Sequence, residues 1–204
     1  MIAIVHYGLG NVHAIANIYK RLGIPQVIAT TPADLAAASH IVLPGVGAFD
    51  WAMKRLNESG LREALEHCVL VERKPVLGIC VGMQMLAQRS EEGSLPGLSW
   101  IHGEVRRFDA SRFAGETRLP HMGWNDVRPR QTGGLFKQLT SGARFYFLHS
   151  YYFSPKNDDN VLATTDYFGE FACSVGSENI YGVQFHPEKS HQWGIQLLKN
   201  FAEL

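Results

Sequence analysis

The chain has 204 residues and carries 19 basic and 19 acidic side chains, so its formal net charge is zero. This length fits one α/β domain with a sizeable core, whereas the balanced charge is not typical of a dedicated nucleic-acid binder. No apolar run approaches the roughly 18 residues of a membrane span, and the first residues lack a secretory signal. We therefore expect a cytoplasmic protein that binds neither nucleic acid nor membrane.

The first half of the chain alternates short apolar runs with patterns of helical spacing. Gly23 closes the first helical pattern as a C-terminal cap, and Thr31 with Pro32 opens the second. Such alternation predicts a parallel sheet with helices on its faces. The predicted strands cover residues 2–5, 27–29, 41–43 and 76–79, and the predicted helices cover 12–22, a short stretch from 32, 61–72 and 82–89.

The second half changes character after the last of these helices. Residues 91–134 are rich in Gly, Pro, Ser and Arg without a helical period, which indicates short β segments and loops. Strand patterns return at 144–148, 161–165, 171–175 and 180–184, and a last helix is expected over about 192–201. The predicted fold is α/β, with a mostly parallel central sheet flanked by helices and a short additional β-rich region near residues 100–150. We expect a single domain over residues 1–204.

One cysteine stands in a setting that suits catalysis. Gly78-Ile79-Cys80-Val81-Gly82 follows a buried strand and opens a helix, which is the sequence form of a nucleophile elbow with Cys in place of Ser. The glycines leave room for a strained turn. The helix N-terminus favours a thiolate, and the N–H of Val81 would point at a developing oxyanion.

The remaining cysteines lack such a setting. Cys68 falls in a helical pattern and Cys173 in a strand, so we interpret both as ordinary buried cysteines. The three cysteines form no CxxC pair, which disfavours a zinc or redox site, and the odd number fits a reducing compartment. We expect no metal and no cofactor.

A thiol nucleophile requires a base, and the base requires an orienting group. Among nine histidines, His186 follows the strand 180–184, at the sheet edge where α/β active sites form. Glu188 lies two residues further on and can accept a hydrogen bond from the imidazole. Taken alone, this motif also fits a His–Pro turn with a solvated Glu. His149, which also ends a strand, is the main rival as base.

These motifs resemble those of the class I, or triad, glutamine amidotransferases. Residues 77–84 are similar to the family's nucleophile signature, 186–188 to its histidine signature, and 44–49 to its oxyanion strand; Val81 stands where the family often has Leu. The resemblance implies that Cys80 attacks the glutamine carboxamide and that ammonia leaves. The roles implied are His186 as proton shuttle, Glu188 as its orienting group, Val81, Gly45, Val46 and Gly47 as oxyanion donors, and Gln84, His149, Ser150 and Tyr151 as the glutamine site.

Four further segments narrow the resemblance within that family. Residues 7–11, 120–125, 147–152 and 181–190 are similar to glutaminase subunits that feed a (β/α)8 cyclase subunit in histidine biosynthesis. The implied partner uses the ammonia to make imidazole glycerol phosphate and aminoimidazole carboxamide ribotide. In such complexes the oxyanion strand can rest in a flipped, inactive state. Residues implied at the joint are Asn11, Trp124, Tyr146 and Lys189; for Trp124, a core position is the alternative.

Several alternatives remain open at this point. A paralogous subunit that feeds a sugar-modifying synthase would look much the same. An amidotransferase of pyridoxal phosphate synthesis fits less well, because 120–125 and the Tyr pair after Ser150 are foreign to that group. A cysteine peptidase, a DJ-1-like hydrolase or a scaffold with a dead triad is disfavoured by the filled triad and by the Pro-Gly-Val-Gly strand.

Overall fold

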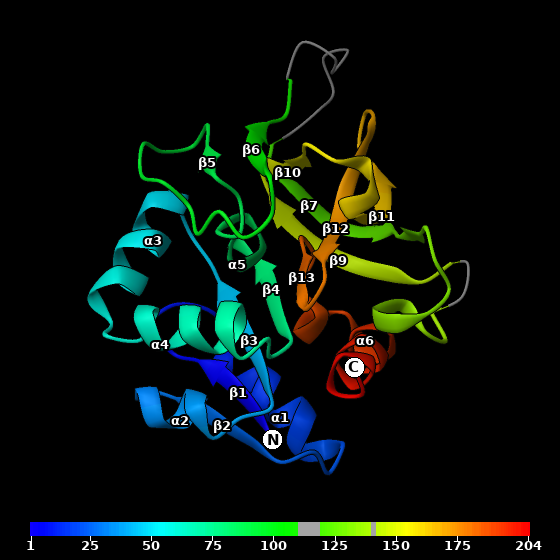
Figure 1. The fold of residues 1–204 in the computed structure, drawn as a ribbon. Helices are drawn as coiled ribbons and strands as arrows, with labels where there is room; N and C mark the ends of the chain where they lie inside the picture. Colours follow the sequence, from blue (N-terminus) through cyan, green and yellow to red (C-terminus); the bar gives the residue numbers. More distant parts are fainter. Residues whose placement is uncertain (110–118, 140–141) are drawn as a thin grey trace.

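The computed structural model describes residues 1–109, 119–139 and 142–204. Across these residues a large central sheet is covered by helices on both faces, with smaller β-sheets at one end (Figure 1). The amino-terminal half contains β1 (Ile2–Val5), α1 (Val12–Arg21), β2 (Gln26–Ala29), α2 (Pro32–Ala36), β3 (His40–Gly45), α3 (Phe49–Glu58), α4 (Arg62–Glu66), a π-helical turn (His67–Val71), β4 (Val76–Cys80) and α5 (Val81–Gln84).

The carboxyl-terminal half is built mostly of strands and ends in one long helix. Its elements are β5 (Arg89–Ser90), β6 (Gly103–Arg107), β7 (His121–Asp126), β8 (Arg128–Pro129), the 3-10 turn η3 (Gly134–Phe136), β9 (Arg144–His149), β10 (Tyr151–Pro155), η4 (Asp158–Asn160), β11 (Val161–Asp166), β12 (Glu170–Ser177), β13 (Ile180–Val183), η5 (Pro187–Lys189) and α6 (His191–Ala202).

The central sheet has eight strands in the order β2-β1-β3-β4-β13-β12-β11-β8. The strands from β2 to β13 run parallel, and β12, β11 and β8 continue the sheet in antiparallel pairing. Right-handed crossovers put α1 on one face of the sheet and α2 and α4 on the other. Helix α2 packs with α4, and α6, which follows the last strand, packs with α1. The predicted α/β class and the β-rich region near residues 100–150, formed by the β10-β6-β5 and β7-β9 sheets, are confirmed.

The helix predicted over 82–89 is wrong, because α5 ends at Gln84. The carbonyls that would continue it accept hydrogen bonds from a loop instead: Leu98 N donates to Met85 O at 2.8 Å and Ser99 N to Ala87 O at 3.0 Å. Gly97 lies so close to the Ala87 carbonyl that a side chain there would not fit. Tertiary hydrogen bonds thus replace the helical ones.

Two further elements differ from the prediction. The helix expected over 61–72 contains a π-helical turn at His67–Val71. Helix α3 was not predicted, although its buried positions follow helical spacing: they are Phe49, Ala52, Met53 and Leu56. Strand β3 extends through Pro44 to Gly45, which pairs with Cys80, instead of ending before them.

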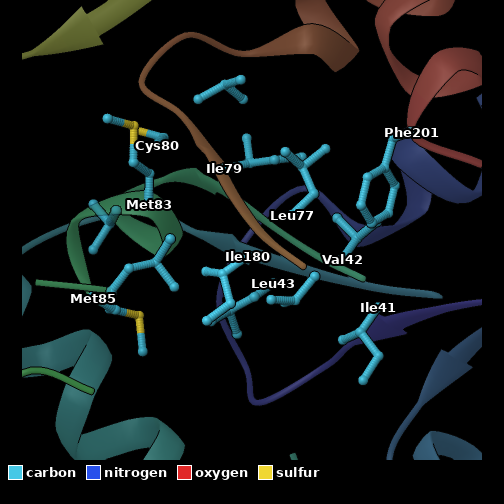
Figure 2. Packing of buried hydrophobic residues seen from close by; sticks show 14 of the residues in the cluster. Ile41, Val42, Leu43, Leu77, Ile79, Cys80, Met83, Met85, Ile180 and Phe201 are labelled. Carbon is cyan, nitrogen blue, oxygen red and sulfur yellow. The ribbon is translucent and has the colours of Figure 1, made fainter. Parts of the chain in front are cut away.

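The core beneath the site is a continuous apolar cluster between sheet and helices. Figure 2 shows side chains of β3 and β4 packed with those of α5, β13 and α6, and Cys80 at the margin of this cluster. Because β1, β3, β4 and β13 run parallel, their carboxyl ends meet at one edge of the sheet. Cys80 ends β4 at that edge, and Val46 and His186 follow β3 and β13 there. No helix among the described residues is long and apolar enough to cross a bilayer.

Candidate active site

The nucleophile turn is strained and tightly packed. Cys80 has φ 56° and ψ −113°, a positive φ that a side chain rarely adopts and that nucleophile elbows use. A Cβ on Gly78 would meet the Gly82 carbonyl oxygen at 2.6 Å, and one on Gly82 would overlap the Leu43 carbonyl oxygen. Backbone therefore packs on backbone around the turn, and this contact holds Cys80 in its strained conformation.

The imidazole of His186 lies between Cys80 and a buried carboxylate. Its Nδ1 is 2.9 Å from Glu188 Oε1, and the side chains are 5% and 2% exposed. Burial by itself lowers the pKa of His186, but its hydrogen bonds to Cys80 and Glu188 and their negative charges raise it to about 10. Because Nδ1 faces the carboxylate, Nε2 is left for the sulfur. The structure thus brings the three predicted triad residues together.

Ser190 anchors the histidine turn to strand β9. Its Oγ donates to the His186 carbonyl oxygen at 2.6 Å and accepts from the Tyr146 N–H at 3.0 Å. The His186 N–H in turn donates to the Tyr146 carbonyl oxygen at 2.8 Å. Ser190 is fully buried, so these bonds are shielded from water and fix the position of the imidazole.

A cavity of about 300 Å³ opens beside the sulfur. Its size suits a ligand as small as an amino acid. The predicted residues Val46, Gly47, Val81, Gln84, His149, Ser150 and Tyr151 line it together with Cys80 and His186. It also contains Glu92, Pro120, Leu148 and Lys189, of which only Lys189 was predicted as a site residue, and then for the partner interface.

Gln84 reaches the cavity from α5 with its amide already oriented. Its Nε2 donates to the Tyr151 carbonyl oxygen at 3.1 Å and to Gln184 Oε1 at 3.0 Å. Both amide hydrogens are thereby used, and Oε1 is the atom left to accept from a ligand. Gln184, which is fully buried, directs its own Nε2 to the Cys80 sulfur at 3.8 Å. The sequence did not single out Gln184, because its burial results from the tertiary structure and has no local sequence signal.

Glu92 is a second residue that the sequence motifs do not reveal. One carboxylate oxygen accepts from the Phe49 N–H at 2.9 Å, at the first turn of α3. The loop that carries Glu92 is held by Asp50, which accepts from the N–H groups of Ser94 and Leu95. The only signal in the sequence was a pair of acidic residues soon after the elbow. The cavity thus contains a carboxylate that suits a cationic group.

His149, the rival base, is fully engaged within the protein. Its Nδ1 lies 2.8 Å from the Tyr151 carbonyl oxygen and its Nε2 lies 3.0 Å from His121 Nδ1. Burial lowers the pKa of His149 to about 3. A ring with both nitrogens occupied and such a low pKa is a poor base for the thiol, which favours His186 in that role.

The predicted oxyanion segment continues β3 beyond the sheet. Gly45 pairs with Cys80, whereas Val46 is 38% exposed and Gly47 has φ 87°. A Cβ on Gly45 would meet Gly82 N at 2.5 Å, but one on Gly47 would meet nothing within 4 Å. Val81, the first residue of α5, is buried beside them. The backbone is therefore constrained at Gly45 and has space at Gly47.

Three of the four predicted interface residues, Trp124, Tyr146 and Lys189, form one group of aromatic and cation–π contacts. The Trp124 ring stacks on His191 at 5.2 Å and meets Tyr146 edge-on at 6.2 Å, and Lys189 Nζ lies 5.5 Å from the Tyr146 ring centroid. Trp124 is 39% exposed, so it is not the core residue of the alternative interpretation. Asn11 is separate and exposed, and makes no side-chain cap bond to α1.

Comparisons with known proteins agree with this geometry. The chain matches the family model of glutamine amidotransferase class-I over residues 3–204. It is 60% identical to imidazole glycerol phosphate synthase subunit HisH of Bdellovibrio bacteriovorus and 47% identical to that of Leptospira interrogans, each over 204 residues and the full length of both chains. Pseudomonas aeruginosa subunit HisH 2 is 44% identical, again over both full lengths.

Solved structures support the fold. A crystal structure of a glutamine amidotransferase superposes with TM-score 0.74 at 20% identity, covering 100% of this chain and 99% of the other. A glutamine amidotransferase from Thermotoga maritima gives TM-score 0.62 at 20% identity, with 92% and 75% covered. The match to the family model and the high sequence identity over the full length of the relatives both show which family the chain belongs to. The chain belongs to the class I glutamine amidotransferases and, within them, to the family of the HisH subunits of imidazole glycerol phosphate synthase.

Proposed function

We propose that residues 1–204 form a single glutamine amidotransferase domain that hydrolyses glutamine to glutamate and ammonia. The observation that carries the proposal is the buried pair of His186 and Glu188, 2.9 Å apart, with the imidazole hydrogen-bonded to Cys80 at the wall of the cavity. A nucleophile, a base and an orienting carboxylate in this order are what acyl transfer from an amide requires. No metal or cofactor has a part in these steps.

The chemistry follows from the positions of these groups. His186 accepts the thiol proton of Cys80, and the sulfur attacks the carboxamide carbon of glutamine. The N–H of Val81 and those of the segment 45–47 stabilise the oxyanion that forms. His186 then donates its proton to the departing nitrogen, which leaves as ammonia. Water, deprotonated by His186, attacks the glutamyl thioester; glutamate is released and the thiol is restored.

The cavity offers partners for the rest of the glutamine molecule. Gln84 Oε1 can accept from an N–H group of the substrate, since the amide nitrogen is already bonded to Tyr151 and Gln184. The backbone around Ser150 and Tyr151 would hold the amino-acid end, and the Glu92 carboxylate suits the α-ammonium group. Together these contacts place the carboxamide against Cys80.

We further propose that the ammonia passes to a (β/α)8 cyclase subunit, which uses it to make imidazole glycerol phosphate and aminoimidazole carboxamide ribotide. The names of the full-length relatives support a partner subunit of this synthase. The exposed side chains Met122 and Leu148, at 66% and 37%, lie on the same antiparallel pair of strands as Trp124 and Tyr146. A face of this composition is typical of the centre of an interface.

We propose that the partner also controls the rate. The space around Gly47 and the exposure of Val46 allow the peptide between these two residues to change its orientation. Docking beside Asn11 and Lys189 would favour the orientation that donates to the oxyanion. The isolated chain should then hydrolyse glutamine feebly, and the rate should rise by orders of magnitude with the cyclase and its nucleotide ligand. An isolated chain that already works at the full rate would contradict this control.

The decisive experiment compares Cys80→Ala with Cys173→Ala in the purified complex with the cyclase. Cys80→Ala should abolish synthesis from glutamine and leave synthesis from added ammonium salts intact, because only the first needs the thiolate. Cys173→Ala, at a buried cysteine away from the cavity, should keep both activities. Loss of both activities in Cys80→Ala would refute the division of labour. Failure of the wild-type complex to form imidazole glycerol phosphate would favour the sugar-modifying alternative.

A further inference from the structure

Two buried histidines lie side by side behind the wall of the cavity. His121 on β7 and His149 on β9 are directly opposite in the register of the two strands, and they are 3% and 6% exposed. Their rings are joined by a contact of 3.0 Å between His121 Nδ1 and His149 Nε2. Neither ring has a part in the chemistry proposed above, although His149 borders the cavity.

The direction of each hydrogen bond can be derived, starting from the Tyr151 carbonyl. A carbonyl oxygen only accepts, so His149 Nδ1, 2.8 Å away, carries a hydrogen. Burial and the neighbouring His121 lower the pKa of His149 to about 3, so the ring is neutral near pH 7 and its Nε2 is an acceptor. His121 Nδ1 must therefore donate to it.

The next hydrogen bond in the series joins His121 to Asn125. Burial lowers the pKa of His121 to about 4, so its Nε2 is an acceptor once Nδ1 donates. Asn125 Nδ2, 3.3 Å away, supplies that donor. The amide of Asn125 is oriented because its Oδ1 accepts from the Asp126 N–H at 2.8 Å and its Nδ2 also donates to the Asp166 carbonyl oxygen at 2.7 Å. The chain of bonds runs one way, from Asn125 to Tyr151.

This chain of hydrogen bonds ends at the Tyr151 carbonyl oxygen, which also accepts a hydrogen bond from Gln84. The Tyr151 carbonyl oxygen accepts from His149 Nδ1 at 2.8 Å and from Gln84 Nε2 at 3.1 Å. Both of its lone pairs are thereby used. The peptide between Tyr151 and Tyr152 is thus held from two sides, from the histidines and from α5. Stacking of His121 on Tyr167 at 3.9 Å and on Phe147 at 4.7 Å prevents its ring from turning.

We infer that His121 is a positioning residue for glutamine: its neutral form, with the hydrogen on Nδ1, orients His149 and so fixes the backbone at Ser150 and Tyr151 that binds the amino-acid end of the substrate. This inference rests on the proposed function, because it assumes glutamine in the cavity. His121 does not touch the reacting atoms. Its loss should weaken substrate binding and leave the chemical step nearly unchanged.

The experiment uses two variants of His121 in the complex with the cyclase. His121→Phe keeps a flat stacked ring but removes the donor, leaving a buried acceptor on His149 without a partner. His121→Asn keeps a donor at the position of Nδ1. We expect His121→Phe to raise the KM for glutamine about five- to thirty-fold, the effect of one unsatisfied buried polar group, with kcat within about twofold. His121→Asn should recover most of the loss.

A matched control and a spectroscopic measurement separate positioning from a merely structural role. His102→Phe changes an exposed histidine and should leave KM unchanged. Nitrogen-15 NMR of the ring nitrogens should show His121 and His149 both protonated at Nδ1, with no titration between about pH 5 and pH 9. Equal KM values for His121→Phe and His121→Asn, or a hydrogen on Nε2 of His149, would overturn the inference. Failure of the proposed function would appear separately, as a wild-type complex without glutaminase activity.

Discussion

The two sides of the oxyanion site use glycine in opposite ways. At the nucleophile turn, Gly78 and Gly82 allow backbone atoms to approach so closely that a Cβ would overlap a carbonyl group. At the end of β3, Gly47 has φ 87° and open space around it. The first pair is required by packing, and Gly47 is required by its backbone conformation.

This difference separates a rigid part of the site from an adaptable one. Cys80 is held at φ 56° by close backbone contacts at Gly78 and Gly82, so the backbone that carries the sulfur is fixed. The peptide between Val46 and Gly47 has no comparable restraint on its Gly47 side. A partner that controls the rate can therefore act on the oxyanion donors without moving the nucleophile, which agrees with the control proposed above.

After Cys80→Ala, Glu188→Gln should lower activity the most, because it acts on the rigid side without changing its shape. Removing the carboxylate lowers the pKa of His186, since Glu188 is one of the groups that raise it. We expect kcat with glutamine to fall about 10²- to 10⁴-fold, as for other orienting carboxylates. Steady-state assays of the complex measure this. The control variant Glu203→Gln changes an exposed residue and should keep wild-type activity. Nearly wild-type activity of Glu188→Gln would show that Glu188 is not part of the triad.

Gly82→Ala tests whether close packing holds the elbow. Its Cβ would overlap the Leu43 carbonyl oxygen, and backbone cannot move aside cheaply. We expect the free energy of unfolding to fall by about 3 kcal/mol or more, or the chain not to fold. Urea unfolding measures the change. Gly133→Ala, where nothing lies within 4 Å, serves as the control. A Gly82→Ala variant as stable as the wild type would mean that the turn can accommodate a side chain at this position.

The pH dependence of stability tests the pairing of His186 with Cys80. The pKa of His186 rises from 6.5 to about 10 in the folded chain, so its stabilising contribution is complete below about pH 6.5 and is lost as pH rises through 10. In Cys80→Ala, which lacks one partner, the pKa of His186 should be lower and the loss should begin at lower pH. Each tenfold decrease in the proton affinity of the imidazole corresponds to about 1.4 kcal/mol of stability. Urea unfolding at several pH values, with Cys173→Ala as control, measures this. Identical profiles would exclude the pairing.

Gly47→Ala should have the smallest effect on stability. The added Cβ meets no atom within 4 Å, so the cost is that of a positive φ alone, about 1 kcal/mol. The increase in glutaminase rate caused by the cyclase should be reduced more than stability is, because the added side chain restricts the peptide that must reorient. Rates with and without the cyclase measure this. A loss of stability as large as that expected for Gly82→Ala would contradict the distinction between the rigid nucleophile turn and the adaptable segment after β3.

Much of the fold could be predicted from local pattern. Buried runs such as Ile2–Val5 and the capped start of α2 at Thr31 and Pro32 are encoded in neighbouring residues. The prediction failed where distant residues decide. Beyond Gln84 the helix stops, because the carbonyls that would continue it bond to a loop more than ten residues away.

The sequence by itself determined the elbow around Cys80, the motif that pairs His186 with Glu188 and the parallel character of the sheet that brings them to one edge, because each depends on short spacings and on the strand-to-helix pattern. Only the tertiary structure decided which side chains complete the cavity. Glu92 lines the cavity, Gln184 and His121 support residues of its wall, and no local spacing relates these three residues. Their roles arise from burial and from hydrogen bonds between distant segments, which exist only once the chain has folded.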